Sequence, residues 1–192
     1  MNAPHTIGIT GGIGSGKSYV ARLLQHTFAL PLYDSDARAR ELMTTSSELR
    51  RQLTDLIGED IYAADGTLNR RRVADFLFHS ADNAAAVNAI VHPVVRHDWL
   101  CFAAQSPGTV LLESALLIEA DMADTVDAIV VVTAPERLRL QRAMARDGAT
   151  EQQVRERMAR QMPEAELITY ADHVVINDGR PLLPQLMPVF HV

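Results

Sequence analysis

The chain has 192 residues, of which 47 % are hydrophobic and 22 % charged, a composition typical of a globular protein with a real core. A formal net charge of −6 argues against a nucleic-acid partner, and no apolar run approaches the roughly 18 residues of a membrane span. A single cysteine, Cys101, excludes an internal disulfide and a multi-cysteine zinc site, and the N-terminus lacks a basic leader, so we expect a cytoplasmic protein without a membrane partner.

Five short runs rich in aliphatic and β-branched residues are predicted strands, and helical patterns separate them. Two of these runs, TVLLES and VDAIVVVT, are almost unbroken apolar stretches, as in strands that are covered on both faces. Strands that alternate with helices predict an α/β fold with a doubly wound parallel sheet. The predicted strands are residues 6–10, 30–36, 109–114, 126–133 and 173–177.

The helical patterns lie between these strands. The first covers residues 17–28, and a mostly helical stretch of about 70 residues follows the second strand, with breaks near Gly58 and Asp65-Gly66. We therefore expect one domain of residues 1–192 that carries a helical insertion at residues 37–106.

The octet GGIGSGKS, residues 11–18, matches the phosphate-loop pattern G-x-x-x-x-G-K-[ST] between a predicted strand and a predicted helix. Its glycines let backbone N–H groups turn inward toward phosphate oxygens, and the helix start adds a positive end. A glycine-rich turn without a ligand is the alternative interpretation. The predicted contacts to a nucleoside triphosphate are Gly12, Ile13, Gly14, Ser15, Gly16, Lys17, Ser18 and Tyr19.

Lys17 is the only lysine in a chain with 17 arginines. A compact ammonium on a long stem can reach the β- and γ-phosphates along the loop, where a planar guanidinium is too broad. Ser18 follows it, and its hydroxyl is a predicted ligand of Mg²⁺.

A phosphate loop occurs in switches, motors and kinases. A GTPase needs an Asn-Lys-x-Asp motif, which cannot exist here because the only lysine lies in the loop. A motor usually has a strand that ends in Asp-Glu, whereas the comparable strand here reads VLLES with Glu113 alone. A small kinase remains, and it needs an acid near the acceptor and cations over the phosphates.

Candidates for both groups are present. Asp34 and Asp36 end the second predicted strand, so they should face the loop at the carboxyl edge of the sheet; helix capping is the alternative. Arg142 and Arg146 are four residues apart on one predicted helix face. We expect residues 136–162, two arginine-rich helices joined by an Asp-Gly turn, to form a lid, although a solvated charged face is the alternative.

The sequence resembles the dephospho-CoA kinase family from about Ile7 to Met187. The blocks that carry the resemblance are ITGGIGSGKS, YDSDARAR, GTLNRRRVADFLF, NAIVHPVV, LLIE, QRAMARDGATEQQVRERMARQ and ADHVVINDG. The resemblance implies transfer of the ATP γ-phosphoryl group to the ribose 3′-hydroxyl of dephospho-CoA with Mg²⁺. For the oligomeric state, we expect either a monomer or a small homo-oligomer.

The same resemblance implies roles for residues near the phosphates. Asp36 matches the catalytic base, and Asp34 would order the water ligands of Mg²⁺. Arg142 and Arg146 match lid arginines near ATP, and together with Lys17, Arg142 is expected to take part in catalysis.

Other matched positions concern the two substrates. Asn177 and Gly179 match the loop that touches adenine, whereas Arg70, Arg71 and His92 match positions on the CoA side of the helical insertion. His92 precedes a proline, so a simple helix boundary is its alternative interpretation.

Two departures from the family pattern limit the transfer of roles. Ser114-Ala115 replaces the usual turn after Glu113, and Tyr19 replaces a usual threonine. The alternatives are another small-molecule kinase, acting on nucleotides or shikimate-like acceptors, and a nucleotide-binding protein without turnover.

Overall fold

The structure is a computed structural model that describes residues 6–191, so the expectation about an N-terminal leader partly concerns residues outside the described part. Two compact units divide the chain. The first contains the segment up to Asp34 and the segment from Ala103 onward, and the second contains Ser35–Phe102. The second unit overlaps the predicted insertion at residues 37–106.

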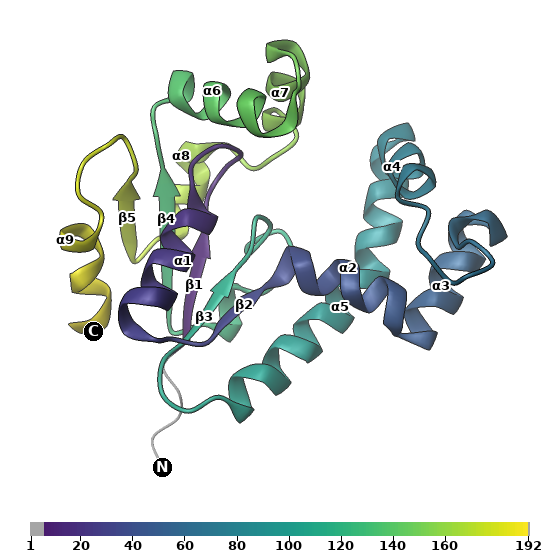
Figure 1. The fold of residues 1–192 in the computed structure, drawn as a ribbon, viewed down its shortest axis with the longest axis horizontal. Coiled ribbons are helices and arrows are strands. Elements are labelled where there is room, and N and C mark those ends of the chain that lie inside the picture. The colour runs from purple at the N-terminus through teal and green to yellow at the C-terminus, as the bar shows by residue number, and fades with distance from the viewer. Residues whose placement is uncertain (1–5, 192) are drawn as a thin grey trace. The chain divides into compact units, whose positions relative to one another are not determined.

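A five-stranded sheet forms the centre of the first unit, and every neighbouring pair of strands is parallel in the order β2-β3-β1-β4-β5 (Figure 1). All five predicted strands and the parallel sheet are confirmed. From β1 the chain runs to β2 on one side, and β4 and β5 lie on the other, so the connections reverse direction beside β1, where α/β proteins bind ligands. The strands are β1 (Thr6–Thr10), β2 (Leu32–Asp34), β3 (Val110–Glu113), β4 (Ala128–Thr133) and β5 (His173–Ile176).

Helices surround this sheet. The predicted helix at residues 17–28 is confirmed as α1 (Lys17–Phe28), whose buried Val20, Ala21 and Leu24 pack into one apolar cluster with β-strand side chains such as Ile9. The remaining helices of the unit are η2 (Ala123–Thr125), α6 (Glu136–Asp147), α7 (Glu151–Met158), α8 (Glu164–Leu167), η3 (Ile168–Tyr170), α9 (Leu183–Leu186) and η4 (Met187–His191).

The second unit is helical, and its predicted breaks are confirmed. Gly58 ends a helix with φ of 122°, a value that favours glycine, and Asp65-Gly66 lies in the loop before the next long helix. Pro93 lies inside one continuous helix, so the interpretation of His92 as a helix boundary is wrong. The helices are α2 (Ser35–Thr45), α3 (Ser47–Ile57), η1 (Glu59–Ile61), α4 (Arg70–His79) and α5 (Ala81–Gln105), of which α5 continues into the first unit.

Apolar side chains on one face of each helix build the core of the second unit. Leu49, Leu53 and Ile57 of α3 recur at intervals of four residues and are buried, as is Trp99 of α5. Within the described residues, no helix has both the length and the apolar character required to cross a membrane.

Candidate active site

Residues 11–16 connect β1 to α1, and Lys17 and Ser18 are the first two residues of that helix, which confirms the strand–loop–helix context of the predicted phosphate loop. Gly14 and Gly16 have φ values of 76° and 92°, which disfavour any side chain. A Cβ atom on Gly14 would also overlap the backbone of Arg139, and one on Gly16 would overlap the side-chain amide of Asn177. The tight loop therefore depends on glycine at both positions.

A buried carboxylate lies beside the end of this loop. Ser18 Oγ donates a hydrogen bond of 2.5 Å to Glu113 Oε1, and Lys17 Nζ lies 4.0 Å from the same oxygen. Glu113 is the last residue of β3 and is 5 % exposed. The lysine ammonium offsets the cost of burying this charge. Glu113 was not predicted as a site residue. Its position at the end of an apolar strand could have indicated that it lies at the edge of the sheet where ligands bind.

The two aspartates of the YDSD segment occupy different elements. Asp34 is the last residue of β2 and is the register partner of Glu113. The prediction that Asp36 ends the second strand is wrong. Asp36 is the second residue of α2, because that helix begins at Ser35 rather than at residue 37. A carboxylate in the first helical turn is stabilised by the helix dipole. Asp34 belongs to the first unit and the exposed Asp36 to the second.

Arg142 and Asn177 converge on the backbone of the loop. Asn177 Nδ2 donates to the carbonyl oxygen of Ser15 at 2.9 Å, and Arg142 Nη1 donates to the same oxygen at 3.4 Å. Arg142 Nη2 also donates to Asn177 Oδ1 at 3.4 Å. Helix α6, the segment after β5 and the loop thus bring three predicted site residues together.

Two further side chains hold the tip of the loop and were not predicted. Arg139 Nε donates to the carbonyl oxygen of Ile13 at 3.1 Å, and the N–H of Ile13 donates to Gln161 Oε1 at 2.8 Å. Arg139 also forms a 2.5 Å ion pair with Glu164. Nothing in the sequence separates Arg139 from the six other arginines of its segment, because the deciding contacts join residues more than 120 positions apart.

Other predicted contacts of the nucleotide lie around this centre. Arg146 forms an ion pair with Asp147, which also binds Arg157 of α7. Hydrogen bonds from Arg146, and less strongly from Arg157, hold the pKa of Asp147 at about 2, below its ordinary value of 3.8. Tyr19 is 62 % exposed, and Gly179 has φ of 106° in the segment after β5.

The predicted residues of the second unit occupy two helices. Arg70 is the first residue of α4 and lines a pocket, whereas the neighbouring Arg71 is 92 % exposed and lies 4.0 Å from Asp75. His92 is half-buried in α5. Within the described part of the chain, no three His, Cys, Asp or Glu side chains converge as a metal site.

Comparison with known proteins decides the family. The profile of CoaE, dephospho-CoA kinase, matches residues 5–182. The chain belongs to the dephospho-CoA kinase family. This family phosphorylates dephospho-CoA in the last step of CoA biosynthesis, so the chain is a kinase.

Individual relatives and solved structures resemble the chain over most of its length. The dephospho-CoA kinase of Porphyromonas gingivalis is 43 % identical over 187 residues, which cover 96 % of this chain and 92 % of the relative. The crystal structure of TT1252 from Thermus thermophilus shares 34 % identity and has a TM-score of 0.82, covering 99 % and 96 % of the two chains. Shikimate kinase from Bacteroides thetaiotaomicron, with 12 % identity, a TM-score of 0.58 and coverage of 97 % and 96 %, shares the fold alone.

Proposed function

We propose that the chain transfers the γ-phosphoryl group of ATP to the ribose 3′-hydroxyl of dephospho-CoA in the cytoplasm, giving CoA and ADP. The observation that carries this proposal is the joining of Lys17 and Ser18 to one buried carboxylate, Glu113, at the end of a phosphate loop. That arrangement suits a triphosphate, because the loop supplies N–H donors and Lys17 supplies a compact charge.

The residues around Ser18 fit a magnesium ion. Magnesium prefers oxygen ligands and usually takes only one or two from the protein, with water and phosphate oxygens completing its shell. The hydroxyl of Ser18 and the carboxylate of Glu113 offer such oxygens, and Asp34 on the neighbouring strand would hold water. When bound, Mg²⁺ would neutralise charge on the transferred phosphates.

The remaining residues have separate tasks in this proposal. Arg142 would balance the charge that develops on the phosphates, while Arg146 and the other side chains of the lid at residues 136–162 exclude water. Asp36 would orient the 3′-hydroxyl and accept its proton. The segment with Asn177 and Gly179 would contact adenine.

Release of ADP in a coupled assay tests the proposal. With saturating Mg²⁺ and ATP, dephospho-CoA should support turnover, whereas nucleoside monophosphates and shikimate should support at most a small fraction of that rate. Turnover with another acceptor and none with dephospho-CoA would contradict the proposal. Binding of ATP without ADP release for any acceptor would favour a nucleotide-binding protein.

A further inference from the structure

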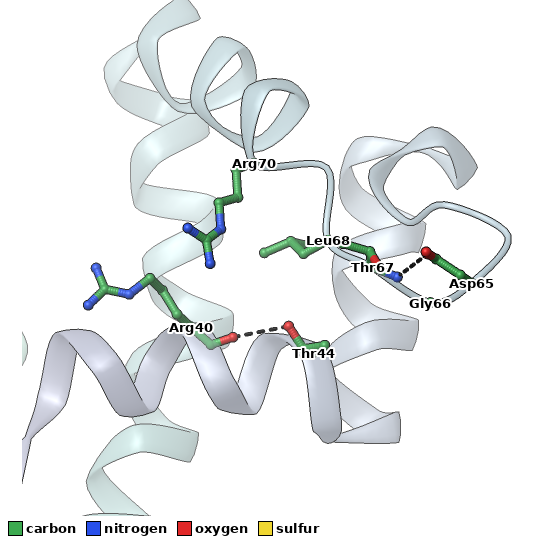
Figure 2. A pocket seen from close by; sticks show the side chains of 7 residues that line it. All are labelled: Arg40, Thr44, Asp65, Gly66, Thr67, Leu68 and Arg70. Atoms are coloured by element: carbon green, nitrogen blue, oxygen red, sulfur yellow. Dashed lines mark hydrogen bonds between the residues drawn. The ribbon is translucent and has the colours of Figure 1, made fainter.

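The arginines of this chain differ in their surroundings. Arg40 and Arg70 of the second unit are exposed and line a pocket (Figure 2). The side chain of Arg139, by contrast, is only 10 % exposed and donates a hydrogen bond to the phosphate loop. Burial of a charged group costs free energy unless the group is paired and hydrogen-bonded. The contacts of Arg139 therefore indicate its task.

Arg139 lies against three consecutive residues of the phosphate loop. Its Nε donates to the carbonyl oxygen of Ile13 at 3.1 Å. A Cβ atom on Gly12 would overlap Nη2 of Arg139, and one on Gly14 would overlap the carbonyl oxygen of Arg139. The side chain and the backbone of one residue of α6 thus enclose the loop on both sides of Ile13.

The contact to Ile13 sets the direction of the next N–H group. The peptide bond between Ile13 and Gly14 is trans and planar, so its C=O and its N–H point in opposite directions. Because Nε of Arg139 holds the C=O, the N–H of Gly14 points away from Arg139. Phosphate loops bind their ligand through backbone N–H groups with a fixed direction.

The N–H groups on either side of Gly14 are used within the protein. The N–H of Ile13 donates to Gln161 Oε1 at 2.8 Å, and the N–H of Ser15 donates to the carbonyl oxygen of Gly12 at 3.1 Å. Among the described residues, the N–H of Gly14 has no acceptor. At the tip of the loop, Gly14 is therefore the residue that can donate to a ligand.

Glu164 fixes the guanidinium group of Arg139. Nη1 forms a 2.5 Å ion pair with Glu164, the first residue of α8, whose side chain is 38 % exposed. A guanidinium is rigid and planar, so holding Nη1 also holds the direction of Nε. The carboxylate neutralises the cation as well. Arg139 thus acts on the loop as a fixed donor rather than as a free positive charge.

We propose that Arg139, held by Glu164, is a positioning residue that directs the N–H of Gly14 to a β- or γ-phosphate oxygen of ATP. Arg139 does not touch the nucleotide in this proposal, because it acts through the peptide group between Ile13 and Gly14. The proposal rests on the proposed function, since it takes ATP as the ligand of the loop.

Nuclear magnetic resonance of protein labelled with ¹⁵N-glycine observes Gly14 directly. In the original protein, Mg²⁺ and ATP should move the amide proton signal of Gly14 downfield, because this proton gains a charged acceptor. AMP, which lacks the β- and γ-phosphates, should move it much less. In Arg139→Gln the shift at saturating ATP should be smaller. An unmoved Gly14 signal in the ATP-bound original protein, or an equal shift in the variant, would overturn the proposal.

The same titrations give the dissociation constants. Arg139→Gln should raise the Kd for ATP by about 10- to 100-fold, the usual loss when a hydrogen bond to a charged group is removed. The Kd for AMP should stay within about twofold of its original value. Equal losses for both nucleotides would show a merely structural role. The matched control is Arg155→Gln, which should change neither constant, because Arg155 is an exposed arginine of α7 that pairs with Glu136 and Glu151.

Two further variants separate shape from charge. Arg139→Lys keeps the positive charge but not the planar fork, so it should recover only part of the lost ATP affinity, and full recovery would contradict the proposal. If Arg139→Gln fails to fold, Glu164→Gln, which changes a partly exposed residue, should still raise the Kd for ATP by about fivefold. An unchanged Kd in that variant would overturn the proposal.

The titrations contain no acceptor substrate. Absence of turnover with dephospho-CoA, while ATP still binds, would therefore overturn the proposed function and leave the assignment of Arg139 to these measurements. Absence of ATP binding by the original protein would overturn both.

Discussion

At the scale of single residues, Lys17 has a largely buried side chain beside the carboxylate of Glu113. Its side chain is 14 % exposed, and its ammonium lies 4.0 Å from Glu113, which also accepts a hydrogen bond from the hydroxyl of Ser18. An ammonium can be shared between this carboxylate and the phosphates because it is compact and carries three donors that rotate. A guanidinium has the same charge but a wide, planar shape.

Lys17→Arg therefore tests shape rather than charge. We expect kcat/KM for ATP to fall by about 10²-fold or more, because the larger group cannot lie along the loop. The measurement is steady-state kinetics, with the melting temperature as a control for folding. Near-normal turnover would mean that any cation serves at this position.

Asp36 and Asp34 differ in the roles that we assign to them. Asp36→Asn keeps the shape of the side chain but cannot accept a proton, so kcat should fall by about 10² to 10⁴ while both KM values change little. Asp34→Asn should instead weaken the binding of Mg²⁺. The activity that this variant loses should therefore become smaller as the Mg²⁺ concentration rises. Kinetics of both variants across a Mg²⁺ titration make the comparison. Recovery of Asp36→Asn by Mg²⁺, without recovery of Asp34→Asn, would exchange the two roles.

At the scale of elements, the predicted lid is joined to the phosphate loop at Ile13. The side chain of Ile13 packs against the apolar cluster of Leu140, Ala143 and Val154, which joins α6 to α7. The N–H of Ile13 donates to Gln161, which follows α7. Movement of these helices would thus change the position of the loop.

Gln161→Ala tests this connection. Without an acceptor for its N–H, Ile13 should lose its fixed position, and the KM for ATP should rise by about 5- to 10-fold, the value of one ordinary hydrogen bond. The control is Gln152→Ala, since the side chain of Gln152 on α7 donates a hydrogen bond to Glu156 within the same helix. Identical KM values for the two variants would show that the contact does not position the loop.

Asp147 at the end of α6 forms an ion pair with Arg157 of α7. Because the pKa of Asp147 is lowered in the fold, the contribution of this carboxylate to stability depends on pH. A carboxylate whose folded pKa is about 2, against 3.8 when unfolded, stabilises the fold above pH 4 and loses this contribution as the pH falls toward 2. Because its arginine partners are partly exposed, the contribution at pH 7 should be about 1 kcal/mol. About half of it should remain at pH 3.

Urea unfolding of the original protein and of Asp147→Asn at pH 7 and at pH 3 measures this effect. The difference in the free energy of unfolding between the two proteins should be smaller at pH 3. An equal or larger difference at pH 3 would show that the charge of Asp147 does not contribute to stability.

At the scale of the whole molecule, the sequence patterns predicted the sheet and the helix boundaries well. An unbroken apolar run such as VVV in β4 is typical of a strand that is covered on both faces. A glycine such as Gly58 ends a helix because it can adopt a backbone conformation that other residues disfavour. The first turn of α2 was placed two residues late, because DSDA also fits a turn. Local rules thus suffice for most of the fold.

The site was predicted less completely, because its contacts join distant segments. The loop residues follow from one short motif, but Glu113, Arg139 and Gln161 reach it from 95 or more positions away. Charge alone does not distinguish a paired arginine from an unpaired one.

In the reaction that we propose, the chain places a phosphoryl group on the 3′-hydroxyl of dephospho-CoA. The most direct measurement is phosphorus NMR of the complete reaction with ATP, Mg²⁺ and dephospho-CoA. We predict that each ADP is accompanied by one new phosphomonoester, assigned to the ribose 3′ position, while the diphosphate signal of the acceptor persists. Formation of ADP with inorganic phosphate and unchanged dephospho-CoA, or a phosphomonoester at any other position, would contradict the account.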